Sequence, residues 1–165
     1  MHRASIIDTK LITTWRTYDY PLRARYLLLL PCACVLLLNG CDFDKRDFIN
    51  TARTTFESIC NGDPSAEKAI DWYVIRINDE ELGRTYMQLT TDYERAEFRK
   101  SITSRLRKYY ASRGWTPQRV RGWKIQARGV ESATVVAAPP GGIISMSLQK
   151  HGAEKKIILI EDKQG

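Results

Sequence analysis

The sequence predicts an α+β fold, in which N-terminal helices pack on a curved, cone-like antiparallel sheet of three to four strands. Three observations predict it. Apolar residues recur every three or four positions from Phe48 to Tyr109, which is the period of one helix face. After Pro117 the apolar period changes to two, as in a half-buried strand. Glycine and proline clusters separate the segments, and helices followed by a run of strands are typical of the α+β class.

The first predicted helix runs from Asp44 to Cys60. Its apolar face repeats at spacings of four, four and three residues, through Phe48, Ala52, Phe56 and Ile59. The segment Asn61-Gly62-Asp63-Pro64 ends it, because glycine supplies a left-handed cap and proline forbids continuation. Ser65 is expected to cap a second, short helix that ends near Trp72. Residues 72–77 either extend that helix or form a strand.

Two more helices are expected before the sheet. The first begins at Asp79, where three consecutive acids suit the positive end of a helix dipole, and ends near Leu89. The second covers residues 93–112 and ends at Arg113-Gly114. Its predicted buried stripe is Phe98, Ile102, Leu106 and Tyr109.

Alternation of apolar and polar residues predicts the strands. The apolar positions are Trp123, Ile125 and Ala127 in the first strand, Ala133, Val135 and Ala137 in the second, and Ile144, Met146 and Leu148 in the third. A fourth strand is expected over residues 156–161. The inner, concave face of the sheet is expected to come from Trp123, Ile125, Val135, Met146 and Leu148 or their alternates.

The N-terminal segment predicts export. Arg23 and Arg25 precede thirteen residues without a charge, 26–38, whereas a membrane span needs about 20. A short apolar run after a basic flank is typical of a signal peptide. We therefore divide the chain into a cleaved signal peptide (1–40), a short tether (41–47) and one domain (48–165).

The end of this run, Leu38-Asn39-Gly40-Cys41, resembles the lipobox of bacterial lipoproteins. The resemblance implies cleavage before Cys41, recognition of Leu38, Asn39 and Gly40 by the peptidase, and attachment of diacylglycerol to the cysteine thiol. Asp42 resembles the signal that keeps lipoproteins in the inner membrane, facing the periplasm. Residues 42–47 reach roughly 20 Å at most, so the domain is expected to stay close to the membrane.

The cysteines predict no disulfide in the mature chain. Cys32 and Cys34 lie in the apolar run and leave with the signal peptide, and Cys41 carries lipid. Cys60 then has no partner within the chain. It follows the apolar face of the first helix, so we expect it to be buried rather than reactive.

The order of elements is similar to small lipoproteins with the nuclear-transport-factor-2-like, or cystatin-like cone, fold. The segments that carry the resemblance are residues 48–63, the 123–127 strand with its hairpin to 133–137, and the 146–160 hairpin. That fold hosts isomerases, dehydratases, secretion-machine assembly subunits and binding domains, so it selects no single function.

The sequence offers little catalytic chemistry. The two histidines are His2 in the signal segment and His151 in a turn, which leaves no metal cluster and no nucleophilic triad. There is no phosphate-binding glycine motif, and no cofactor is expected. Enzymes of cone folds often resemble a ketosteroid isomerase, with an Asp base and a Tyr donor. The corresponding candidates are Asp71, Tyr73, Tyr86, Asp92 and Tyr93, and we interpret them as core aromatics and solvated acids, not as catalytic residues.

A basic segment covers residues 95–128, with eleven bases against the single acid Glu97. We define its candidate binding patch as Arg99, Lys100, Arg105, Arg107, Lys108, Arg119 and Arg121. With Tyr109, Tyr110 and Trp115 interleaved, such a segment suits nucleic acid, but an envelope address excludes that partner. The alternatives are an anionic membrane surface, an acidic envelope protein and a solvated helix face.

The sequence therefore predicts an envelope lipoprotein that acts as a non-enzymatic binding or assembly module. Its partner is the membrane surface, another envelope protein or a small ligand. The alternative is an isomerase- or hydrolase-type enzyme that uses the concave pocket. A pocket with a desolvated Asp near Tyr hydroxyls would favour the enzyme, and a cone filled by side chains would count against it.

Overall fold

The computed structural model describes residues 44–164. The signal peptide, the lipobox and Asp42 lie outside these residues. Phe43–Gly165 forms one compact unit, and its buried residues make one continuous hydrophobic cluster. Within the described range, no helix is both long enough and apolar enough to cross a membrane.

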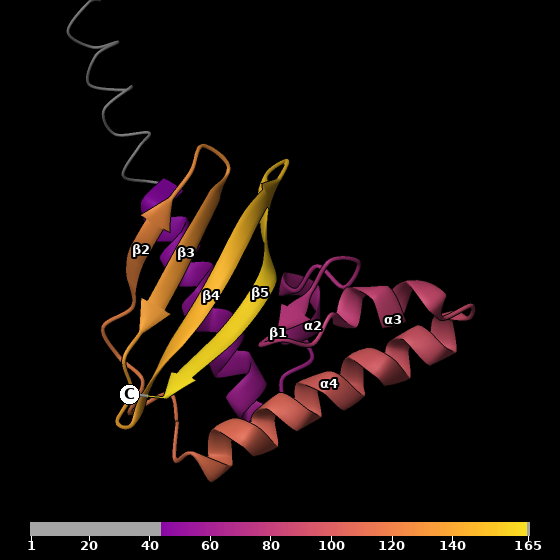
Figure 1. Ribbon diagram of the computed structural model, residues 1–165, viewed down its shortest axis with the longest axis horizontal. Coiled ribbons are helices and arrows are strands. Elements are labelled where there is room, and N and C mark those ends of the chain that lie inside the picture. The colour runs from indigo at the N-terminus through magenta and orange to yellow at the C-terminus, as the bar shows by residue number, and fades with distance from the viewer. Residues whose placement is uncertain (1–43, 165) are drawn as a thin grey trace, which may run out of the picture. The chain divides into compact units, whose positions relative to one another are not determined.

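An open five-stranded mixed sheet is the centre of the domain (Figure 1). Its strand order is β1-β5-β4-β3-β2, with bounds Arg76–Ile77 (β1), Lys124–Arg128 (β2), Ser132–Ala137 (β3), Gly142–His151 (β4) and Glu154–Gln164 (β5). β2 to β5 form the predicted antiparallel meander. The expectation of a purely antiparallel sheet is wrong in one strand. β1, from the undecided segment 72–77, pairs in parallel with β5 through Arg76–Leu159 and Ile77–Ile160.

The first helix, residues 44–61, crosses one face of the sheet (Figure 1). All four predicted face residues, Phe48, Ala52, Phe56 and Ile59, are buried, which confirms the helical period. The helix ends in a Schellman motif. Gly62 has φ of 70°, its N–H donates to the Ile59 carbonyl at 3.2 Å, and the Asp63 N–H donates to the Ser58 carbonyl at 2.8 Å.

The second and third helices are shorter than expected. α2 (Ser65–Ala69) ends three residues before Trp72. Ser65 is the first residue of this helix and not its N-cap, which is Pro64. The Asp63 carboxylate accepts the Ser65 N–H at 2.8 Å. α3 (Leu82–Gln88) begins after the acidic run and not at Asp79 as predicted, because Ile77 and Glu80 exchange backbone hydrogen bonds of 3.0 and 3.1 Å in a turn before it.

The fourth helix, α4 (Asp92–Ser112), is the longest element. Thr91 and Glu94 form a capping box at its start. Ile102 and Leu106 are buried as predicted, but the stripe ends on Tyr110 (1% exposed), while Tyr109 is only partly buried. Tyr109 and Tyr110 both lie on the inner side of the helix, because they follow Leu106 by three and four residues. These are the spacings that place side chains on one face of a helix.

The predicted inner face of the sheet is packed, not open. Val135, Met146 and Leu148 are fully buried, and Phe56 from the first helix contacts Trp123, with ring centroids 5.7 Å apart. Ala127 is exposed, contrary to expectation. A bulge between Ile125 and Ala127 shifts the register and turns Ala127 to the outer face.

Candidate functional site

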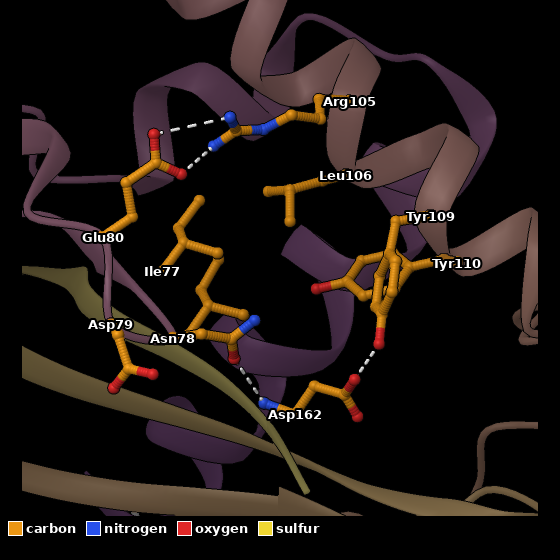
Figure 2. Close-up of a pocket in the computed structure, with 10 residues that line it drawn as sticks. Ile77, Asn78, Asp79, Glu80, Arg105, Leu106, Tyr109, Tyr110 and Asp162 are labelled. Carbon is orange, nitrogen blue, oxygen red and sulfur yellow. Dashed lines mark hydrogen bonds and ion pairs between the residues drawn. The ribbon is translucent and has the colours of Figure 1, made fainter. Parts of the chain in front are cut away.

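The main pocket of the described residues lies between α4 and the edge of the sheet formed by β1 and β5. It has a volume of about 600 Å³. That is within the usual range of roughly 300–1,000 Å³ for small-molecule sites. Figure 2 shows its lining residues: Ile77, Asn78, Asp79, Glu80, Arg105, Leu106, Tyr109, Tyr110, Ile160 and Asp162.

Two polar bridges from α4 frame this pocket. The Arg105 guanidinium pairs with the Glu80 carboxylate at 2.6 Å. One turn further along the helix, the Tyr109 hydroxyl donates to an oxygen of Asp162. Figure 2 shows the two bridges on opposite sides of the open space. Because residues four apart on a helix lie on one face, a single run of α4 supplies both contacts.

The floor between the bridges is apolar apart from one hydroxyl group. Ile77, Leu106 and Ile160 are each less than 10% exposed, and so is Tyr110. The Tyr110 hydroxyl is buried and has no hydrogen-bond partner. It points toward the middle of the pocket in Figure 2. Burial raises the pKa of Tyr110 above its ordinary value, so the hydroxyl keeps its proton.

Asp162, on β5, is one of the acidic residues that line the pocket. Its backbone N–H donates to the Asn78 side-chain oxygen at 2.9 Å, which fixes β5 beside the segment after β1. One carboxylate oxygen accepts from Tyr109, while the other, Oδ1, is buried without a partner. Burial raises the pKa of the Asp162 carboxyl above its ordinary value.

Some residues of the predicted basic patch form ion pairs within the domain, and others do not. Arg99 contacts Glu67 at 3.2 Å and also donates to the Tyr86 hydroxyl at 2.7 Å, so it braces the core. Lys100 lies 3.9 Å from Glu97. Among the described residues, no carboxylate lies within ion-pair distance of the other patch members: Arg107, Lys108, Arg119 and Arg121. Arg105 is the one member of the patch that lines the main pocket.

Three of the five acids and tyrosines that the cone resemblance suggested lie together, but none of the five lines the main pocket. The Tyr73 backbone N–H donates to the Asp71 carboxylate at 3.1 Å, and the Tyr73 and Tyr86 rings pack edge to face with centroids 5.4 Å apart. Asp71 pairs with His151 at 3.4 Å beside β5. Tyr86 is buried against Arg99, whereas Tyr73 is more than half exposed. Asp92 and Tyr93 lie exposed at the start of α4.

Cys60 is half-buried, which is less than the burial expected from the sequence. Its thiol lies 3.8 Å from the Trp115 carbonyl oxygen. Burial raises the pKa of the thiol to about 11, which disfavours the nucleophilic thiolate. The described part of the chain contains no cluster of His, Cys, Asp and Glu that could hold a metal ion.

Sequence reasoning missed Asp162 as a site residue, although one signal was present. The predicted fourth strand stopped at Glu161, but β5 continues to Gln164. Side chains two apart on a strand share a face, so Asp162 follows the buried Ile160 inward. An acid that continues a buried strand face is the kind of exception that marks functional sites.

The raised pKa of Asp162 predicts a pH effect on stability. Folding favours the protonated carboxyl, so this contribution is complete below the unfolded pKa, near 3.8, and is lost as pH rises through the folded pKa. Asp162→Asn should therefore gain stability relative to wild type between about pH 3 and pH 7. Urea unfolding at several pH values measures the difference.

The control for this experiment is Glu131→Gln, which removes an exposed acid in the turn between β2 and β3. A loss of relative stability in Asp162→Asn as pH rises would contradict the account. It would mean that the hydrogen bond from Tyr109 stabilises the charged carboxylate more than burial destabilises it.

Comparison of the chain with family models, with curated proteins and with solved structures found no match.

Proposed function

We propose that the protein is a cell-envelope lipoprotein whose domain binds a small ligand without transforming it. The lipid on Cys41 holds the domain at the membrane, and Asp42 favours the inner membrane, on its periplasmic side. The cone-like architecture expected from the sequence is part of this proposal, and the arrangement of helices beside an open five-stranded sheet supports it. The ligand occupies the pocket under α4, at the end of the domain where β1 joins β5.

The observation that carries this proposal is the apolar pocket with its unpartnered hydroxyl. Ligand sites combine a mainly apolar lining with few, fixed polar groups. Ile77, Leu106 and Ile160 provide the apolar surface, and the Tyr110 hydroxyl provides a polar group that no described residue satisfies. A buried polar group without a partner costs roughly 1–3 kcal/mol, and a ligand that pairs with it recovers part of that cost.

The basic patch supports the membrane-surface and partner-protein alternatives less well. Arg99, Lys100 and Arg105 each lie within 4.0 Å of a carboxylate, so their charges are partly neutralised inside the domain. Attraction to anionic headgroups depends on the charge that remains near the surface. The patch therefore offers fewer uncompensated charges than the sequence suggests.

An acid–base enzyme is the second candidate, and Asp162 is the observation that favours it. A desolvated carboxyl beside the Tyr109 hydroxyl lines the pocket, as an isomerase or hydrolase would require. A general base must reach the proton that it removes. One Asp162 oxygen is engaged by Tyr109, and the other is buried and points away from the open space in Figure 2, so this carboxyl presents no free oxygen to a bound molecule. Binding without catalysis fits this geometry better.

The anchor is tested in the bacterial host with Cys41→Ser. We expect the variant to incorporate no labelled palmitate and to remain as an uncleaved precursor, because the thiol that accepts diacylglycerol is gone. Cys60→Ser serves as the matched control and should be processed normally. Normal processing and lipid labelling of Cys41→Ser would refute the proposed anchor.

The pocket is tested with the neutral fluorescent probe N-phenyl-1-naphthylamine and with Phe43–Gly165, the compact unit that contains the whole described core. The probe should brighten on binding. Leu106→Trp should reduce its affinity at least about tenfold, because the larger ring fills the pocket, at a cost in stability of roughly 1–3 kcal/mol. Fluorescence titration measures the affinity, and thermal unfolding checks the fold.

Met87→Trp is the control for that substitution, since Met87 is exposed on α3 and outside the pocket. It should bind the probe like the wild type. Equal binding by a folded Leu106→Trp variant, or no binding by the wild type, would contradict a ligand site under α4.

A further inference from the structure

The polar groups of the pocket restrict which ligands it can accept. Three lining residues are acidic, Asp79, Glu80 and Asp162, against the single base Arg105. Glu80 already holds Arg105 at 2.6 Å. A ligand anion would therefore meet a surplus of negative charge and no uncommitted cation among the lining residues. Burying an unpaired charge is costly, so the pocket disfavours carboxylates and phosphates.

A cationic head group is disfavoured at the floor for a different reason. The groups there are Ile77, Leu106, Ile160 and the Tyr110 hydroxyl. Of the lining carboxylates, Glu80 is held by Arg105, and Asp162 has one oxygen on Tyr109 and the other turned away from the open space in Figure 2. An ammonium group at this depth would lose its hydration and gain one neutral hydroxyl, which is poor compensation for a charge.

The floor instead matches one neutral polar group. The Tyr110 hydroxyl is a donor that keeps its proton, and its oxygen can also accept. A carbonyl or hydroxyl group that reaches the floor would satisfy it, while the rest of the ligand lies against the apolar side chains. The two bridges leave the space between them open to such a molecule, as Figure 2 shows.

We infer that the pocket selects neutral, mainly apolar ketones or alcohols that enter with the oxygen first, and that Tyr110 is the residue that recognises the oxygen. This inference rests on the proposed ligand-binding function. It makes Tyr110 a specificity determinant, whereas Leu106, Ile77 and Ile160 bind any apolar body of suitable size.

A series of naphthalene derivatives tests this inference, because its members share one apolar body. The probes are 2-acetylnaphthalene, 2-ethylnaphthalene, 2-naphthoate and 2-(aminomethyl)naphthalene. Competition with N-phenyl-1-naphthylamine on Phe43–Gly165 gives each affinity. The ketone should bind about tenfold more tightly than the ethyl compound, as expected for one buried hydrogen bond, and the two ions should bind more weakly than the ketone.

Tyr110→Phe removes one oxygen atom and keeps the ring. It should weaken ketone binding about tenfold, leave the ethyl compound unchanged, and unfold at the same or a higher temperature than the wild type, because the lost hydroxyl had no partner. Tyr73→Phe, at an exposed tyrosine outside the pocket, is the matched control and should behave like the wild type.

The outcomes separate this inference from the proposed function. Equal affinities for the ketone and the ethyl compound, both lost in Leu106→Trp, would overturn the role of Tyr110 and keep the pocket. Tightest binding of the naphthoate or the amine would overturn the selection of neutral ligands. Failure of all four compounds to compete for a bound probe would overturn the inference, and failure of the probe itself to bind would overturn the function on which it rests.

Discussion

The burial of Ile102, Leu106 and Tyr110 is the contact on which the rest of the site depends. These residues hold α4 against the domain, and they fix which side of the helix faces β1 and β5. Because Leu106 and Tyr110 point inward, the residues before them in the sequence, Arg105 and Tyr109, lie one above the other along a neighbouring strip of the helix surface. They meet Glu80 and Asp162 there. Hydrophobic packing thus positions the polar bridges, and the exposed Arg105–Glu80 ion pair is too weak to position the helix by itself.

The pocket exists because α4 meets the sheet at its edge. Over the central strands, Phe48, Phe56 and the inner residues of β3 and β4 fill the interior. The edge strand β1 has only two residues, and the side chains of α4 do not fill the space between the helix and this strand. The hydroxyl of Tyr110 is left without a partner at this place.

Local sequence patterns predict most of the helices and strands of this fold. The features that they do not predict depend on pairing between residues far apart in the sequence. The spacing of Phe48, Ala52 and Phe56 determines a helix face because the period is a property of the chain itself. The parallel pairing of β1 with β5 joins residues more than eighty positions apart, and no local pattern contains it. The bulge that turns Ala127 outward depends likewise on how β2 aligns with β3.

The candidate site was harder to predict than the fold for the same physical reason. Arg105 and Tyr110 were visible in the sequence as members of a basic, aromatic segment. Their role depends on Glu80 and Asp162, which reach α4 only after the sheet forms. Charge composition alone suggested a surface patch, because it does not show that Arg99 and Arg105 are paired within the domain.

The central claim is that a ligand binds under α4, and methyl NMR tests it most directly. Phe43–Gly165 with labelled isoleucine and leucine methyl groups is titrated with 2-acetylnaphthalene. The account predicts the largest shift changes at Ile77, Leu106 and Ile160. Ile158 lines a separate hollow beside β3 and β4 and serves as the internal reference. Changes concentrated at Ile158, or no changes at saturating probe, would contradict the claim.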